Sequence, residues 1–255
     1  MSRDDPSPSA DSDARRQELT EALARLEERV VAACTVANRP RAEVTVIAVT
    51  KTFPASDVMH LAALGLTDVG ENRAAEVADK EYECRAAGVT ELRWHFLGQL
   101  QTNKAGVVAE CCDVVHSVDR LKLVTALDRG AERAGRRLRC LVQVDLDAGA
   151  GDDAWSGHGA ARGGAAPGVV AAIADALATA QHVGLAGVMA VAPLGGDPAD
   201  AFARLAKVAA EVQSQHPGAT VISAGMSGDL EEAVIHGATH LRVGRALLGS
   251  RPPLG

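Results

Sequence analysis

The chain has 255 residues, of which 47% are hydrophobic and only 2% aromatic, and its net charge is −7. A negative charge and so few aromatic side chains argue against a nucleic-acid-binding protein, which needs a basic surface and stacking platforms. No apolar run approaches the roughly 18–20 residues that a membrane-spanning helix requires. The length suits one large α/β domain or two small ones.

Residues 1–14 are rich in Pro, Ser and Asp, which predicts a disordered N-terminal tail without the apolar core of a signal peptide. The five cysteines are scattered without the CxxC spacing of a metal or redox site. We therefore expect reduced thiols that pack in the core, no metal, no membrane association and a cytoplasmic location.

After this tail, apolar residues at spacings of three and four predict an amphipathic helix over residues 15–36. The next segment, VTVIAVT at 44–50, is a continuous apolar run with many β-branched residues. Such a run is typical of a parallel strand that is buried on both faces.

From there to the end of the chain, strand-like and helix-like segments alternate. Further strands are expected at 66–71, 92–98, 113–118, 138–146, 183–191, 219–225 and 239–244. Helices are expected at 55–65, 72–88, 102–110, 119–135, 167–180, 197–215, 227–237 and 245–250. Eight alternating units in a chain of this length predict a single (β/α)8 TIM barrel over 15–255, with one extra N-terminal helix. A doubly wound open sheet is the alternative.

One segment, 147–167, is rich in Gly and Ala and has no periodicity. It is too long for an ordinary connection, so we expect a flexible insertion, either a lid or merely a tolerated extension.

In TIM barrels the chemistry lies at the C-terminal ends of the strands. Lys51 stands at the end of the first strand. A lysine in this place can pair with an acid, or it can be a desolvated amine that forms Schiff bases with carbonyls. The Gly- and Ser-containing loops at 223–228 and 242–249 suit a phosphate, although such glycines can also serve tight turns alone. An aldehyde that carries a phosphate, such as pyridoxal 5′-phosphate (PLP), would satisfy both halves of this site.

These residues resemble the PLP homeostasis proteins, also called the YggS or PROSC family, which are relatives of the alanine racemase N-terminal barrel. The resemblance rests on AVTKTFPASDV, DVGENRAAE, LRWHFLGQLQTNK, VHSVDRLK, GLAGVMAVAP and ISAGMSGDLEEAVIHGATHLRVGRALLG, and it spans about residues 44–250. It implies a cytoplasmic, monomeric protein that holds PLP as an aldimine on Lys51 and supplies it within the cell, with apo PLP-dependent enzymes as possible partners.

The resemblance also assigns the remaining cofactor-binding residues. Ser227, Gly244 and Arg245 correspond to the phosphate loops, with Ser223 and Met226 nearby, and Arg242 to the residue that faces the pyridine nitrogen. Residues that line the cofactor pocket in the family correspond to Asn72, His95 and Met189. The family usually has Thr or Ser where this chain has Arg245, so a phosphate contact from that side chain is in question.

Little or no catalytic turnover is expected. An arginine at the ring nitrogen disfavours its protonation and weakens carbanion chemistry. The second acid/base of alanine racemase is a tyrosine from a second domain, and the only tyrosine here, Tyr82, falls in a predicted helix. Two enzymatic alternatives stay open: a PLP-dependent amino-acid racemase that uses His95 or a cysteine as second base, and a Schiff-base aldolase without cofactor.

Overall fold

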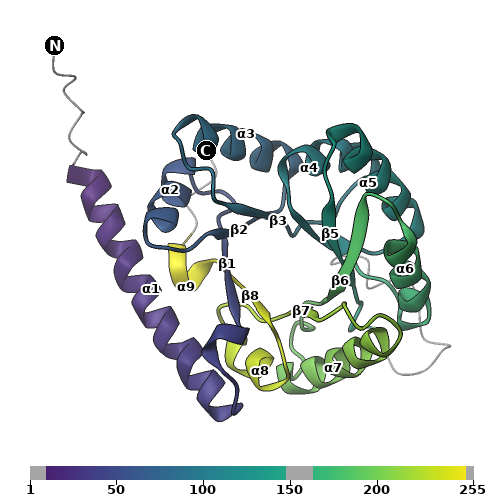
Figure 1. The fold of residues 1–255 in the computed structure, drawn as a ribbon. Helices are drawn as coiled ribbons and strands as arrows, with labels where there is room; N and C mark the ends of the chain where they lie inside the picture. The colour runs from purple at the N-terminus through teal and green to yellow at the C-terminus, as the bar shows by residue number, and fades with distance from the viewer. Residues whose placement is uncertain (1–9, 148–162, 251–255) are drawn as a thin grey trace.

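The computed structural model describes residues 10–147 and 163–250. Eight parallel strands form a closed barrel in which each strand pairs with its neighbours in chain order and β1 pairs with β8 (Figure 1). The strands are β1 (Thr45–Val49), β2 (Asp68–Glu71), β3 (Arg93–Phe96), β4 (Val114–Val118), β5 (Leu138–Gln143), β6 (Val183–Met189), β7 (Val221–Ser223) and β8 (His240–Val243). The predicted TIM barrel is thus confirmed, and the open sheet is not formed.

Helices follow the strands and cover the outside of the barrel (Figure 1). They are α2 (Ala55–Ala63), α3 (Ala74–Ala86), α4 (Ala105–Cys111), α5 (Leu121–Ala134), α6 (Pro167–Thr179), α7 (Pro198–Gln215), α8 (Leu230–Ile235) and α9 (Arg245–Leu248). Two single turns of 3₁₀ helix, η1 (Arg41–Glu43) and η2 (Thr102–Lys104), precede β1 and α4. None of the helices in the described ranges is long and apolar enough to cross a membrane.

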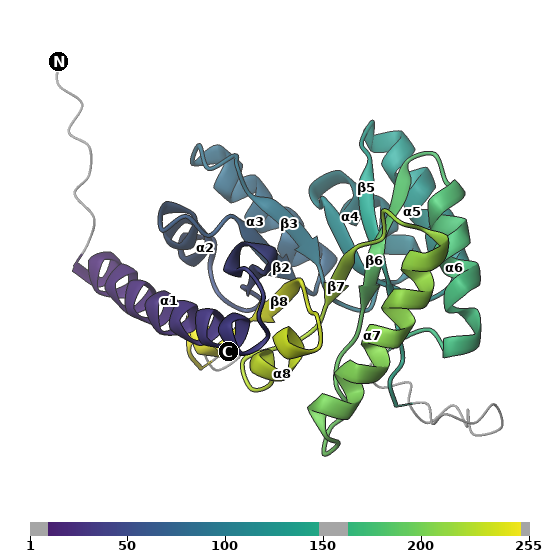
Figure 2. The same ribbon diagram turned by 60° about the horizontal axis from the view of Figure 1, so that its bottom comes forward.

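The extra N-terminal helix, α1 (Ala10–Val36), lies along the outside of the barrel beside α2, α9 and α8 (Figures 1 and 2). It begins five residues earlier than expected, so residues 10–14 are helical and not part of a tail; residues 1–9 lie outside the described residues. Two carboxylates in its first turn, Asp11 and Asp13, favour this longer start because they complement the helix dipole. Arg15 holds the helix to the barrel through an ion pair with Asp57 of α2 at 2.8 Å.

Apolar side chains form two separate clusters. The larger lies between the sheet and the helices and contains all five cysteines, which are free and buried. The smaller one consists of residues from β4 to β7: Val114, Leu141, Ala186, Met189 and Val221. Since neighbouring residues of a strand face opposite sides, this second cluster fills part of the barrel interior, which also contains the hydrogen-bonded side chains of His95, His116 and Arg242.

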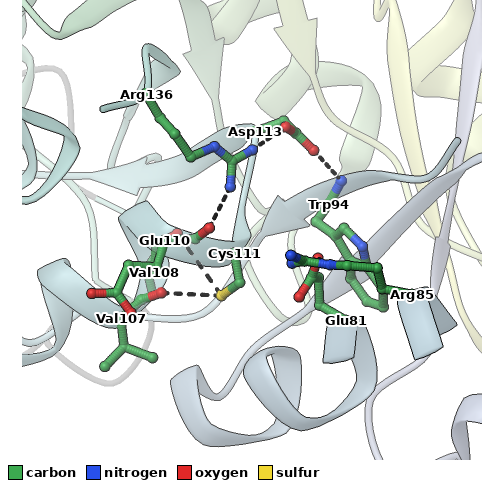
Figure 3. A network of polar contacts seen from close by, with 9 residues as sticks. All are labelled: Glu81, Arg85, Trp94, Val107, Val108, Glu110, Cys111, Asp113 and Arg136. Carbon is green, nitrogen blue, oxygen red and sulfur yellow. Dashed lines mark hydrogen bonds and ion pairs between the residues drawn. The ribbon is translucent and has the colours of Figure 1, made fainter. Parts of the chain in front are cut away.

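A polar network surrounds Asp113, the residue that directly precedes β4 (Figure 3). It therefore lies at the N-terminal end of that strand, opposite the C-terminal strand ends where chemistry is expected in this architecture. Arg136 donates to Asp113 at 2.6 Å, and Asp113 accepts the backbone N–H of Trp94 at 2.8 Å. The thiol of Cys111 donates to the carbonyl oxygen of Val107 at 3.1 Å. These contacts satisfy polar groups locally and hold the α4–β4 connection in place, as expected for the face of a barrel that supports stability.

Of the expected insertion at 147–167, residues 148–162 lie outside the described residues. Its C-terminal part returns to the barrel: Ala165 forms a parallel bridge with Val144, just beyond β5. The side chain of Gln143 donates to the carbonyl oxygen of Gly163 at 2.9 Å. Residues 163–165 are therefore pinned to the strand end by hydrogen bonds.

Candidate functional site

Lys51 follows β1 and is half-buried at the C-terminal end of the strand. The residues on both sides of it are held through their backbone. The carbonyl oxygen of Thr50 accepts a hydrogen bond from the Lys80 ammonium at 2.8 Å, and the N–H of Thr52 donates to Glu76 at 2.5 Å. Thr52 has a φ of 70°, a left-handed conformation that a β-branched residue rarely adopts. The backbone that carries Lys51 is thus fixed in a strained conformation by side chains of α3.

Lys80 itself sits in a buried cluster on the helix side of the sheet. Its ammonium lies 2.6 Å from Glu71 and 3.0 Å from Glu76, in addition to its bond to Thr50. The hydroxyl of Thr50 donates to the same Glu71 oxygen at 2.6 Å. Burial raises the pKa of Glu71, while Lys80 acts against this shift. Since three acceptors use the three ammonium protons, Lys80 serves as a structural cation and Lys51 is the amine at the strand end.

Arg242 of β8 is only 6% exposed. Its guanidinium donates to the hydroxyl of Ser223 and to the carbonyl oxygen of Ala190, each at 2.8 Å. Burial lowers the pKa of Arg242 to about 10. Within the described ranges no carboxylate lies at ion-pair distance from it, and both recorded acceptors are neutral. The charge of Asp229 acts against this shift of the Arg242 pKa. The guanidinium has five N–H groups, so donors beyond those to Ser223 and Ala190 can serve an acceptor on a ligand.

His95 is fully buried in β3, and both of its ring nitrogens have protein partners. Nε2 lies 2.8 Å from Asp68, and Nδ1 lies 2.8 Å from Nε2 of His116. The other nitrogen of His116 lies 2.9 Å from the Ser223 hydroxyl. The predicted pocket residue His95 therefore has no ring nitrogen left for a ligand, although it is linked through His116 to the residues around Arg242.

The loops after β7 and β8 are tied together by Ser227, whose hydroxyl accepts the backbone N–H of Ala246 at 3.0 Å. Arg245 is the first residue of α9, and its side chain is exposed. Met226 is 39% exposed, and its N–H donates to Asp229 at 2.6 Å. The two loops together present hydroxyl and backbone groups at one place, which is the arrangement that binds anions in many barrels.

These loops lie close to Lys51. β8 pairs with β1, with Val243 opposite Ala48. A Cβ on Gly244 would lie 3.3 Å from the carbonyl oxygen of Val49, two residues before Lys51. Only a residue without a bulky side chain allows such a close approach. The fold therefore places the predicted amine and the predicted phosphate loops side by side.

The remaining pocket residues stand at neighbouring strand ends. Asn72 is half-buried directly after β2, and Met189 ends β6 with 2% exposure. The loop after β3 passes directly over the backbone of Asn72, because a Cβ on Gly98 would lie 2.1 Å from the Asn72 carbonyl oxygen. Glycine is required there, and it holds the two loops in contact.

Four further buried residues are connected to the site, and no sequence motif pointed to a role for them: Asp68, Glu71, Lys80 and His116. For His116 the sequence did contain a signal. The alternation of residues along β3 and β4 places His95 and His116 on the inward face of neighbouring strands, so their contact was predictable. The pairing of Lys80 with Glu71 offered no such signal, because nine residues and a change from strand to helix separate them.

Known proteins resemble this chain in sequence and in fold. The family model described as "Alanine racemase, N-terminal domain" matches residues 21–252. The pyridoxal phosphate homeostasis protein of Mycobacterium tuberculosis is 42% identical over 250 residues, which cover 93% of this chain and 94% of that protein. The solved structure of PipY from Synechococcus elongatus with PLP bound is 36% identical and has a TM-score of 0.72, with 88% and 99% of the two chains covered. An alanine racemase of Clostridium difficile shares the fold at 14% identity, with a TM-score of 0.68, 92% of this chain and 57% of that one covered.

Proposed function

Because the chain belongs to the family of pyridoxal phosphate homeostasis proteins, within the larger alanine racemase N-terminal domain family, we propose that it binds PLP and maintains its supply in the cell. The observation that carries this proposal is the position of Gly244 against β1, which puts an amine beside two loops suited to a phosphate. PLP has three groups for such a site: an aldehyde, an aromatic ring with one nitrogen, and a phosphate. The aldehyde condenses reversibly with an amine.

Each part of the site then has a task. Lys51 is the covalent anchor. The hydrogen bonds from Lys80 to Thr50 and from Thr52 to Glu76 fix the backbone on both sides of it, so that its side chain is directed toward the mouth of the barrel. Ser227 and the backbone at 244–246 hold the phosphate. The exposed Arg245 side chain attracts the phosphate by its charge but does not need to contact it. Asn72, Met189, Ser223 and Met226 border the ring and the loops.

In this proposal the free N–H groups of Arg242 would donate to the ring nitrogen, and the guanidinium charge would disfavour protonation of that nitrogen because two adjacent cations repel. The candidates for a second acid/base are poorly placed. Tyr82 is 72% exposed on α3, and all five cysteines belong to the cluster between sheet and helices. Both ring nitrogens of His95 have protein partners. Binding and release of the cofactor without substantial turnover is the activity that these residues support.

The test begins with the absorption spectrum of the full-length protein after PLP is added, followed by borohydride reduction and peptide mapping. The chain has five lysines, so the map is simple: Lys51, Lys80, Lys104, Lys122 and Lys207. We expect a visible band and a pyridoxyl mass on the peptide with Lys51, and neither in Lys51→Arg. Lys104→Arg is the matched control and should bind as the wild type does. A label spread over several lysines would sink the proposal.

Exchange of the α-proton of amino acids in deuterated water distinguishes a carrier from an enzyme. We expect exchange no faster than that given by free PLP, whereas a racemase would exceed it. Transfer to apo PLP-dependent enzymes can be followed by recovery of their activity, and a monomer is expected in sedimentation. Five unpaired thiols suit the reducing cytoplasm, which is the compartment we propose.

A further inference from the structure

A line of hydrogen bonds crosses the barrel interior from the candidate site toward the opposite end. It starts at Arg242, whose Nη1 donates to Ser223 at 2.8 Å. Ser223 lies 2.9 Å from Nδ1 of His116, and Nε2 of His116 lies 2.8 Å from Nδ1 of His95. The line ends where Nε2 of His95 lies 2.8 Å from the carboxylate of Asp68. Five strands each contribute one residue to this line: β2, β3, β4, β7 and β8.

The two ends of this line determine where every proton lies. A guanidinium can only donate, and an ionised carboxylate can only accept. Ser223 accepts from Arg242, so its own proton goes to Nδ1 of His116. His116 then carries its proton on Nε2 and donates to His95. His95 in turn carries its proton on Nε2 and donates to Asp68.

The alternative arrangement has a protonated His95 paired with Asp68. His116 would then have to accept at Nε2 and donate from Nδ1 to Ser223. The Ser223 oxygen would receive two donors, and its own proton would have no acceptor along the line. A buried hydroxyl proton without an acceptor is costly, so the arrangement with two neutral imidazoles is favoured.

Burial favours the neutral form of both imidazoles, and at His116 the surrounding charges act in the same direction. His95, His116 and Ser223 have no exposed surface. Burial lowers the pKa of both histidines, and for His116 this shift is large. Around His95, Asp68 and Asp113 favour the charged form and Arg93 opposes it. The groups that face His116 all oppose its protonation: His95, Arg242, His240 and Arg139.

We propose that Asp68, His95 and His116 are positioning residues, which fix the Ser223 oxygen as an acceptor and thereby hold the Arg242 guanidinium in one orientation. The second hold on this guanidinium is the Ala190 carbonyl oxygen, 2.8 Å from Nη2. With two of its donors fixed on Ser223 and Ala190, the remaining N–H groups of Arg242 keep a constant direction. This inference rests on the proposed function in one respect, namely that a ligand with an acceptor atom lies beside Arg242.

The first test needs no ligand. The full-length protein is labelled with ¹⁵N-histidine, and the ring nitrogens are assigned from the signals lost in His95→Gln and His116→Gln. We expect both rings to be neutral Nε2–H tautomers at neutral pH and to stay so at pH values where the exposed histidines are protonated. A proton on Nδ1 of either ring, or a doubly protonated His95, would overturn the proposal. This readout is the same whether or not the protein binds PLP.

The second test compares two substitutions at His116. A glutamine has an acceptor and a donor, so it can receive the Ser223 proton and donate to His95, whereas a leucine can do neither. We expect the PLP dissociation constant to rise about tenfold in His116→Leu and by no more than about threefold in His116→Gln. The pH profile of the visible band should shift in the leucine variant alone. His216→Gln, on the outer surface, is the control and should bind as the wild type does.

Equal losses in both His116 variants would show that the imidazole serves packing only and would overturn the positioning role. Circular dichroism and thermal unfolding check that each variant is folded. If His116→Leu does not fold, the ¹⁵N measurement on the wild type still decides between the two proton arrangements. Failure of the wild type to bind PLP would instead remove the proposed function and leave the tautomers as a separate result.

Discussion

The ammonium group of Lys80 lies 2.8 Å from the carbonyl oxygen of Thr50, the residue that precedes Lys51. Lys80 approaches from α3, on the helix side of the sheet. It thus holds the end of β1, which carries the candidate anchor Lys51. The same ammonium group is paired with Glu71, whose side chain has no exposed surface. This buried ion pair connects the stability of the barrel to the position of Lys51.

Replacing Lys80 should therefore damage the fold. In Lys80→Met the buried carboxylate of Glu71 loses its cation, and breaking such a pair typically costs about 3–5 kcal/mol. We expect the free energy of unfolding in urea to fall by about that amount. Lys104→Met, at the end of η2, is the matched control and should change it by less than about 0.5 kcal/mol. Equal midpoints for the two variants would contradict this account.

The phosphate loops can be tested with two forms of the ligand. Ser227→Ala removes the hydroxyl that joins the two loops, so we expect PLP to bind about tenfold more weakly, as for the loss of one hydrogen bond to a charged group. Pyridoxal, which lacks the phosphate, should bind equally to Ser227→Ala and to the wild type. A comparable loss with both ligands would place Ser227 away from the phosphate.

Arg245 offers a complementary prediction, because its side chain is exposed in this structure. Arg245→Ala should weaken PLP binding by no more than about threefold at physiological salt, since an exposed charge contributes only about 0–1 kcal/mol. The small effect should disappear as the salt concentration rises. A loss of tenfold or more that persists in high salt would mean that the guanidinium contacts the phosphate directly.

The loop contact over Asn72 should tolerate no side chain at position 98. In Gly98→Ala the new Cβ would lie 2.1 Å from the Asn72 carbonyl oxygen, so the loops after β2 and β3 must separate. We expect a loss of stability of roughly 1–3 kcal/mol in thermal or urea unfolding, together with weaker PLP binding. Gly218→Ala is the matched control, because nothing lies within 4 Å of its Cβ and its φ is not in the left-handed region.

Acid should weaken the fold in a defined pH range. Burial lowers the pKa of His240 to about 4, and it also lowers the pKa of His95 and His116. The unfolded chain binds protons near pH 6.5 that the folded protein does not, so the stability is fully present above that pH and is lost as the pH falls toward 4. Each such proton contributes a slope of at most about 1.4 kcal/mol per pH unit. His240→Gln should reduce the slope measured by urea unfolding; an unchanged slope would mean that His240 is protonated in the folded state.

The sequence by itself determined the fold to within a few residues. Continuous apolar runs such as 44–50 can be buried on both faces only in a parallel sheet that is covered by helices, and the regular alternation then leaves a barrel as the simplest closure. The amine at 51 and the two loops near 227 and 244 were also predictable, because strand ends in this architecture meet at one mouth. The start of α1 was predicted five residues too late, since Asp and Ser in a first turn look like a tail when helix packing is unknown.

Only the tertiary structure decided what supports the site. The contact of Lys80 with Thr50 depends on the placement of α3 against the sheet, and no local spacing encodes it. The sequence likewise suggested His95 as a residue that lines the pocket, but in the folded barrel its two nitrogens are bonded to Asp68 and His116. Buried polar groups must find partners wherever the fold brings them together, so their roles follow from three-dimensional neighbours that the order of residues does not specify.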